Sequence, residues 1–191
     1  AGAYVARGNK GDIQRAVEIY ESIAANSTNS PQTRAYAYNL LALLHDSSAR
    51  NNLTKDTGHL SQDDFDLAEQ EDEGRTMVRD FFQMSNTIYP TAVANYYLAS
   101  MIASDLLRKG IDPTSPSQQI EAKAIRQHVS VGDELFDKIS STTYGVVRIG
   151  SLYYARAIAI SVAASYFDDI TDEDANMVYQ QALTFISQDQ N

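Results

Sequence analysis

The sequence predicts an all-α fold, and two observations carry this prediction. Apolar residues recur at three- and four-residue spacing along most of the chain, and proline or glycine stands at several of the expected helix boundaries. No stretch shows the strict alternation of a strand, apart from a brief region at Val146 and Val147. We therefore expect at least seven helices and essentially no sheet.

The clearest helix is expected at 90–109, where Pro90 suits the first position and Gly110 suits the stop. Asp12, Ser30, Ser115 and Thr171 are the expected N-caps of other helices. The remaining helices are expected at 1–7 (a short remnant), 13–25, 31–48, 62–88, 118–140, 144–167 and 174–187. Gly74 leaves open whether 62–88 is one bent helix or two.

The spacing also predicts which faces are buried. The expected core positions are Ala16, Val17, Tyr20, Ile23, Met77, Phe81, Met84, Ile88, Ile120, Ala124, Val131, Leu135 and Ile139. Gly132 is expected to weaken its helix by about 1 kcal/mol relative to alanine.

Length and composition favour a single domain over residues 1–191 with a true apolar core. The net charge of −10 argues against nucleic acid and against an anionic membrane surface, since both bind clustered Lys and Arg. No apolar run is suited to membrane insertion, because the best candidate, 149–167, contains Arg156 and several serines. The absence of cysteine excludes disulfides, thiolate metal sites and a Cys nucleophile, and leaves the cellular location unknown.

A repeat is visible in three of the expected helices. Tyr96 lies 58 residues after Tyr38, and Tyr153 lies 57 residues after Tyr96. Each tyrosine is followed four residues later by a small residue: Ala42, Ser100 and Ala157. A large ring followed one turn later by a small side chain suits close antiparallel helix packing. We expect these tyrosines to be mostly buried.

The intervening helices share a second pattern, a small or flexible residue, an aromatic residue four positions later and an apolar one three positions after that. It occurs at Ala16, Tyr20 and Ile23, at Met77, Phe81 and Met84, and at Ala175, Tyr179 and Ala182. These motifs resemble the tetratricopeptide repeat (TPR) family, closely over 13–23 and 174–182 and only in architecture elsewhere. The units here are longer than the family's, and His128 takes the aromatic position of the third such helix on one alignment.

The resemblance implies antiparallel helix hairpins stacked as an α-solenoid of about seven or eight helices. An ordinary helical bundle is the alternative. If residues 1–8 are the end of a broken first helix, an uncovered apolar edge would favour self-association there or a preceding segment.

No pattern indicates catalysis, a cofactor or a metal site. His45, His59 and His128 lack ligand spacing, and a structural role is the simpler interpretation. The acidic run 63–73 lacks the pattern of a calcium loop, and 145–150 lacks the lysine of a phosphate-binding loop. A pair of carboxylates brought together only by the fold stays open. We expect a protein that is not an enzyme.

The expected function is a scaffold that binds a peptide or partner protein in a concave groove. One residue after each repeat tyrosine, the next column of side chains points about 100° away, toward that groove. The predicted binding strip consists of Asn39, Tyr97, Met101, Ser104 and Tyr154. The alternative is an accessory protein for solute capture whose tyrosine-lined cavity holds a small ligand.

Overall fold

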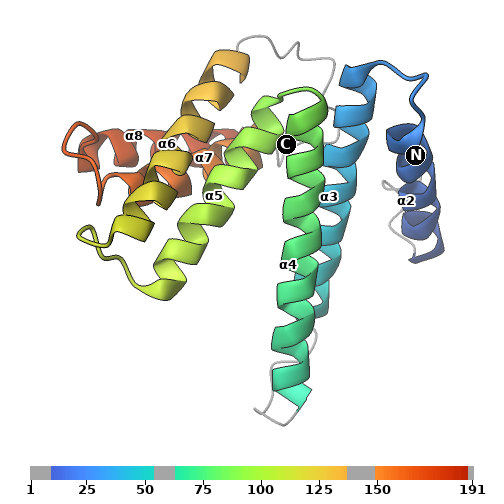
Figure 1. The fold of residues 1–191 in the computed structure, drawn as a ribbon, viewed down its shortest axis with the longest axis horizontal. Coiled ribbons are helices and arrows are strands. Elements are labelled where there is room, and N and C mark those ends of the chain that lie inside the picture. Colours follow the sequence, from blue (N-terminus) through green and yellow to red (C-terminus); the bar gives the residue numbers. More distant parts are fainter. Residues whose placement is uncertain (1–9, 54–62, 137–148, 189–191) are drawn as a thin grey trace. The chain divides into compact units, whose positions relative to one another are not determined.

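The computed structural model describes residues 10–53, 63–136 and 149–188, and its regular secondary structure there consists of seven α-helices without a strand (Figure 1). The predicted all-α fold is therefore confirmed. The expected helix at 1–7 lies outside the described residues. The chain divides into two compact units, one ending at Pro90 and the other beginning at Thr91. Each unit is described by itself.

The first unit is a row of three helices, α2 (Lys10–Ala25), α3 (Pro31–Leu53) and α4 (Asp63–Ile88) (Figure 1). α3 packs against α2 on one side and α4 on the other. Its core is built from small and aromatic side chains: Ala16, Tyr20, Ala24, Ala37, Leu40 and Leu41, with Phe81 of α4 against them. Small residues let the helix axes approach, and the rings fill the grooves between them.

Local capping explains where α3 begins. The Ser30 hydroxyl accepts a hydrogen bond from the Thr33 N–H at 3.1 Å, so Ser30 is the N-cap that the sequence predicts. The Arg34 Nε donates to the carbonyl of Ala24 at 2.9 Å and so satisfies a carbonyl in the last turn of α2. These bonds fix the angle at which the chain reverses between the two helices.

The second unit contains α5 (Ala92–Lys109), α6 (Pro116–Phe136), α7 (Ile149–Ala163) and α8 (Asp172–Gln188). α5 and α6 form an antiparallel hairpin, α7 packs against both of them, and α8 packs against α7 (Figure 1). The core that joins them is rich in alanine: Ala99, Ala103, Leu106, Ile125, Ala159, Val162 and Ala163.

The ends of α5 and α8 follow from local chemistry. The Thr91 hydroxyl caps α5 by accepting from the Ala94 N–H at 3.1 Å, and Gly110 ends the helix with a φ of 82° that favours glycine. Thr171 and Asp174 form a reciprocal cap for α8, because each side chain accepts from the other residue's N–H, at 3.1 and 2.9 Å. The sequence predicted the roles of Gly110 and Thr171 correctly.

Several predicted bounds and faces are wrong by a turn or by one residue. α2 begins at Lys10, so Asp12 lies in its first turn and is not the N-cap. The question that Gly74 left open is answered by α4, which is one continuous helix. α7 ends at Ala163, because the next residues form turns in which Ser165 N–H donates to the Val162 carbonyl. Ile120, predicted to be buried, is 68% exposed, and α6 buries Ala122, Ile125 and Gly132 instead.

The repeat register is confirmed at its small positions. Ala42 and Ala157 have no exposed surface and Ser100 is buried. Tyr96 is also buried, whereas Tyr38 and Tyr153 are only half-buried.

An aromatic pair joins the two helices of each hairpin. The ring centroids are 6.1 Å apart for Tyr38 and Phe81, 6.3 Å for Tyr96 and Phe136, and 5.7 Å for Tyr154 and Tyr179. In α7 the pairing residue is thus Tyr154, one position after the predicted Tyr153. Tyr153 contacts Phe136 edge-on at 5.1 Å and so joins α7 to the preceding hairpin.

The aromatic partner in α6 corrects the sequence alignment. Phe136, not His128, packs against the repeat tyrosine, and Gly132 stands four residues before it, as Met77 and Ala175 stand four residues before Phe81 and Tyr179. A Cβ on Gly132 would lie 2.5 Å from Cε1 of Tyr96, which is closer than side chains can approach. Gly132 is therefore needed for the close contact of α5 with α6.

Candidate partner-binding surface

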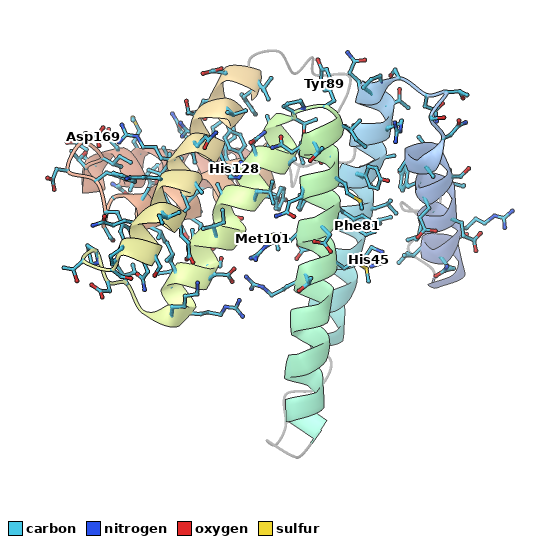
Figure 2. All side chains as sticks on the ribbon, viewed as in Figure 1. His45, Phe81, Tyr89, Met101, His128 and Asp169 are labelled. Atoms are coloured by element: carbon cyan, nitrogen blue, oxygen red, sulfur yellow. The ribbon has the colours of Figure 1, made fainter. Side chains whose placement is uncertain are left out.

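The structure places three members of the predicted strip on one face of α5. Tyr97, Met101 and Ser104 follow one another at i, i+4 and i+7, and all three are half-buried (Met101 is labelled in Figure 2). The Ser104 hydroxyl donates to the Ser100 carbonyl at 2.8 Å, so its hydrogen is used within the helix. This face offers an aromatic ring and a flexible thioether, with limited exposed area.

The other two members lie elsewhere. Tyr154 of α7 is 40% exposed, and its ring packs against Tyr179 of α8. Asn39 belongs to the first unit and has no exposed surface. The strip as a whole stays a prediction, and Asn39 has no surface for a partner in the structure.

A polar cluster that the sequence did not reveal joins α5, α6 and α7. The Tyr96 hydroxyl donates to Asp133 Oδ1 at 2.6 Å, and Arg156 donates to both oxygens of the same carboxylate, each at 2.7 Å. This bidentate ion pair has the geometry in which arginine binds carboxylates most strongly.

The electrostatics of this cluster hold Tyr96 and Arg156 each in one protonation state. Burial, reinforced by the hydrogen bond to Asp133, raises the pKa of Tyr96, so its hydroxyl stays protonated. The hydrogen bonds to Asp133 raise the pKa of Arg156, which stays cationic. Since the charges of Arg156 and Asp133 cancel and the donors are engaged, the cluster holds three helices in register.

A second polar pair joins α5 to α6. His128 Nδ1 lies 2.8 Å from Asn95 Oδ1, and Asn95 Nδ2 donates to the Thr91 carbonyl at 2.9 Å (His128 is labelled in Figure 2). Burial lowers the pKa of His128, which favours a neutral ring whose Nδ1–H donates to Asn95. In the first unit, His45 and Phe81 pack ring against ring at 5.5 Å (both labelled in Figure 2). Both histidines thus have packing roles.

An open groove lies on the first unit, between Tyr38 of α3 and one face of α4. We call it the α4 groove; it is lined by Tyr38, Asp80, Gln83, Met84, Thr87 and Ile88 and has a volume of about 420 Å³. The five α4 residues follow one another at i, i+3, i+4, i+7 and i+8, which is a continuous stripe on one side of a helix. Met84 is 48% exposed in this stripe.

Three polar groups of the α4 groove are unused. Within the described part of the chain, the Asp80 carboxylate, the Gln83 amide and the Tyr38 hydroxyl make no hydrogen bond or ion pair. The Thr87 hydroxyl, by contrast, donates to the Gln83 carbonyl at 2.8 Å. A groove with an apolar base and a few free polar groups has the composition of a binding site.

Sequence reasoning missed this groove because it placed the buried face of α4 one residue too early. Met77 and Met84 were expected in the core, yet they are 44% and 48% exposed, while Val78, Phe82 and Ser85 are buried. One residue rotates a helix face by about 100°, and this segment carries apolar residues at both sets of positions. Two exposed methionines beside Asp80, Gln83 and Thr87 are the signal that could have identified it.

The described residues contain no group of three or more His, Cys, Asp or Glu that could hold a metal ion. No helix in the described ranges combines the length and the hydrophobicity that a membrane span requires. Comparison of the chain with protein-family models, with curated proteins and with solved structures gives no match.

Proposed function

We propose that this chain is a non-catalytic protein-interaction module of TPR-like helix hairpins, and that it binds a peptide segment of a partner in the α4 groove. The observation that carries the proposal is the α4 groove itself. It is open, has a volume of about 420 Å³ and contains an exposed methionine, and three of its polar groups make no hydrogen bond or ion pair with the described residues. Methionine suits such a surface, because its flexible, polarizable side chain adapts to different partners.

The packing within the second unit supports the repeat architecture. In a solenoid of two-helix units, each unit contacts its neighbour along the chain. α7 packs against both helices of the preceding hairpin and α8 packs against α7, which is the order expected if α5–α6 and α7–α8 are successive repeats. Each of these hairpins also contains an aromatic pair between its two helices.

The polar side chains of the two clusters in the second unit are used in helix contacts, which is compatible with a binding module. Asp133 is engaged by Tyr96 and Arg156, and His128 is engaged by Asn95. These groups stabilise helix contacts in the arrangement described above. An open trough also suits a peptide better than a small ligand, because small-molecule sites enclose most of the ligand's surface.

The proposal is tested by selecting binders from a displayed library of random peptides against the folded protein. Enriched peptides should bind the parent and lose affinity for Met84→Glu, which places a charge in the apolar base of the groove. Met177→Glu is the matched control, because Met177 is a methionine of similar exposure that lies on α8 and does not line the groove. If no peptide is enriched, or if every enriched peptide binds Met84→Glu as well as the parent, the α4 groove is not the binding site.

The predicted strip is tested with the same peptides. Tyr97→Ala combined with Tyr154→Ala should reduce binding if the strip on α5 and α7 contributes, provided that the melting temperature is retained. Unchanged binding by the folded double variant would exclude the strip and leave the groove as the site.

A further inference from the structure

We infer that the occupant of the α4 groove is an amphipathic helix that places a Lys or Arg against Asp80 and aliphatic side chains against Met84 and Ile88. This inference deepens the proposed function and rests on it. It follows from the spacing of the lining residues, from the one charge among them and from the length of the groove.

The spacing favours a helix. The α4 residues of the groove recur at three- and four-residue intervals, which is the pattern that packs one helix against another. Within the first unit, α2 already packs against α3 through small and aromatic residues at the same spacing. A helix laid along α4 would present its residues i, i+3 or i+4, and i+7 to the groove.

The length of the groove also fits a bound helix. From Asp80 to Ile88 the helix rises by about 12 Å, which is slightly more than two turns. Two turns of a bound helix bring about three side chains into that distance. An extended peptide would span it with only about four residues, of which every second one faces the groove.

The negative charge of Asp80 favours a basic side chain at one end of the bound helix. Asp80 is the only charged residue that lines the groove, it is exposed, and it has no partner among the described residues. The chain as a whole carries a net charge of −10, which favours the approach of a cationic partner. The Gln83 amide beside it can accept or donate a further hydrogen bond.

The order of basic and aliphatic contacts along the bound helix follows from these positions. Asp80 lies at the N-terminal end of the stripe, and Ile88 lies at its C-terminal end in the last turn of α4. The basic residue therefore stands at one end of the bound apolar face, about two turns from the aliphatic residue that meets Ile88. This order of contacts distinguishes the proposed helix from a peptide that binds the apolar residues non-specifically.

The experiment measures binding of synthetic peptides to the full chain by fluorescence anisotropy. The probe is an amphipathic peptide of about 15 residues, the length at which an isolated helix begins to form, with leucines on one face and one lysine at the end of that face. Matched peptides replace this lysine by glutamate, scramble the same composition, or insert a central proline that prevents the helix.

The lysine peptide should bind the parent chain more tightly than the other three. Asp80→Asn should weaken binding by about twofold to fivefold at low salt, as expected for an exposed ion pair, and Met84→Glu by more than about tenfold. Glu21→Gln is the control for Asp80, since Glu21 is an exposed carboxylate of the same unit outside the groove. The glutamate peptide should bind Asp80→Lys better than it binds the parent.

The outcomes separate the inference from the function on which it rests. Binding that depends on Met84 but not on Asp80 or on the lysine would overturn the basic partner and leave the peptide groove standing. Binding of the proline peptide as tightly as the helical one would overturn the helix. If Met84→Glu changes no affinity at all, in these peptides or in those selected from the library, the α4 groove itself is wrong.

Discussion

Replacing Gly132 by alanine should destabilise this protein, although the same change stabilises an ordinary helix. The added Cβ would lie 2.5 Å from Cε1 and 2.7 Å from Cδ1 of Tyr96. That ring is buried, and its hydroxyl is held by Asp133 at 2.6 Å, so the ring cannot move away without weakening this bond.

Two effects of opposite sign decide the result. Alanine in place of glycine within a helix gains about 1 kcal/mol. Overpacking a well-packed contact costs about 1–3 kcal/mol, and weakening a hydrogen bond to a charged group adds about 1.5–3 kcal/mol when the bond is lost. We expect a net loss of about 1–3 kcal/mol for Gly132→Ala, because part of the overlap is relieved by a small shift of the ring.

Urea denaturation, followed by circular dichroism, measures this loss. Gly74→Ala is the control, because Gly74 is also helical and a Cβ there meets no atom within 4 Å, so that variant should gain up to about 1 kcal/mol. In a Tyr96→Ala background the cost of Gly132→Ala should largely disappear, since the ring is gone. If Gly132→Ala is as stable as the parent, the close contact of α5 with α6 is not as described.

Three further predictions address packing, capping and pH. Ala157→Leu should cost about 1–3 kcal/mol in urea melts, because Ala157 has no exposed surface, whereas the exposed Ala25→Leu should be nearly neutral. Thr171→Ala should cost about 1 kcal/mol at pH 7 through loss of the cap. The N–H and hydroxyl of Thr171 lower the pKa of Asp174, so the part of the cap that depends on the Asp174 carboxylate should be present above the unfolded pKa of about 3.9 and lost as the pH falls through the lower folded pKa. Burial lowers the pKa of His128, so its contribution to stability should be full above its unfolded pKa of about 6.5 and should decline below it. His128→Gln should therefore reduce the change of unfolding free energy with pH, measured by urea melts between about pH 7 and 5. An unchanged pH dependence in this variant would contradict the prediction.

The sequence by itself determined the helices and many of their ends. Ser30, Gly110 and Thr171 act where the sequence placed them, because capping depends on a side chain and on backbone groups within a few residues of it. The repeat of tyrosine and small residue likewise located Ala42 and Ala157 in helix contacts, since helical spacing fixes which residues share a face.

Tertiary structure decided which of two possible faces is buried. α4 carries apolar residues at two sets of positions one residue apart, and both satisfy the spacing of a buried stripe. In the structure Val78 and Phe82 are buried, Phe81 packs against the core of α2 and α3, and Met84 lies in an open groove. The sequence cannot decide between these two faces of α4, because periodicity shows only that the helix has an apolar face. Packing against the neighbouring helices determines which face is buried.

Tertiary structure also decided the partners of residues far apart in the chain. Asp133 meets Tyr96 and Arg156 from three different helices, and Phe136 rather than His128 meets the repeat tyrosine. Such contacts depend on how far one helix slides and rotates along another, and the close approach at Gly132 fixes this for α5 and α6. A single sequence records the residues that can make these contacts, but their pairing is set by packing, which is a property of all the helices together.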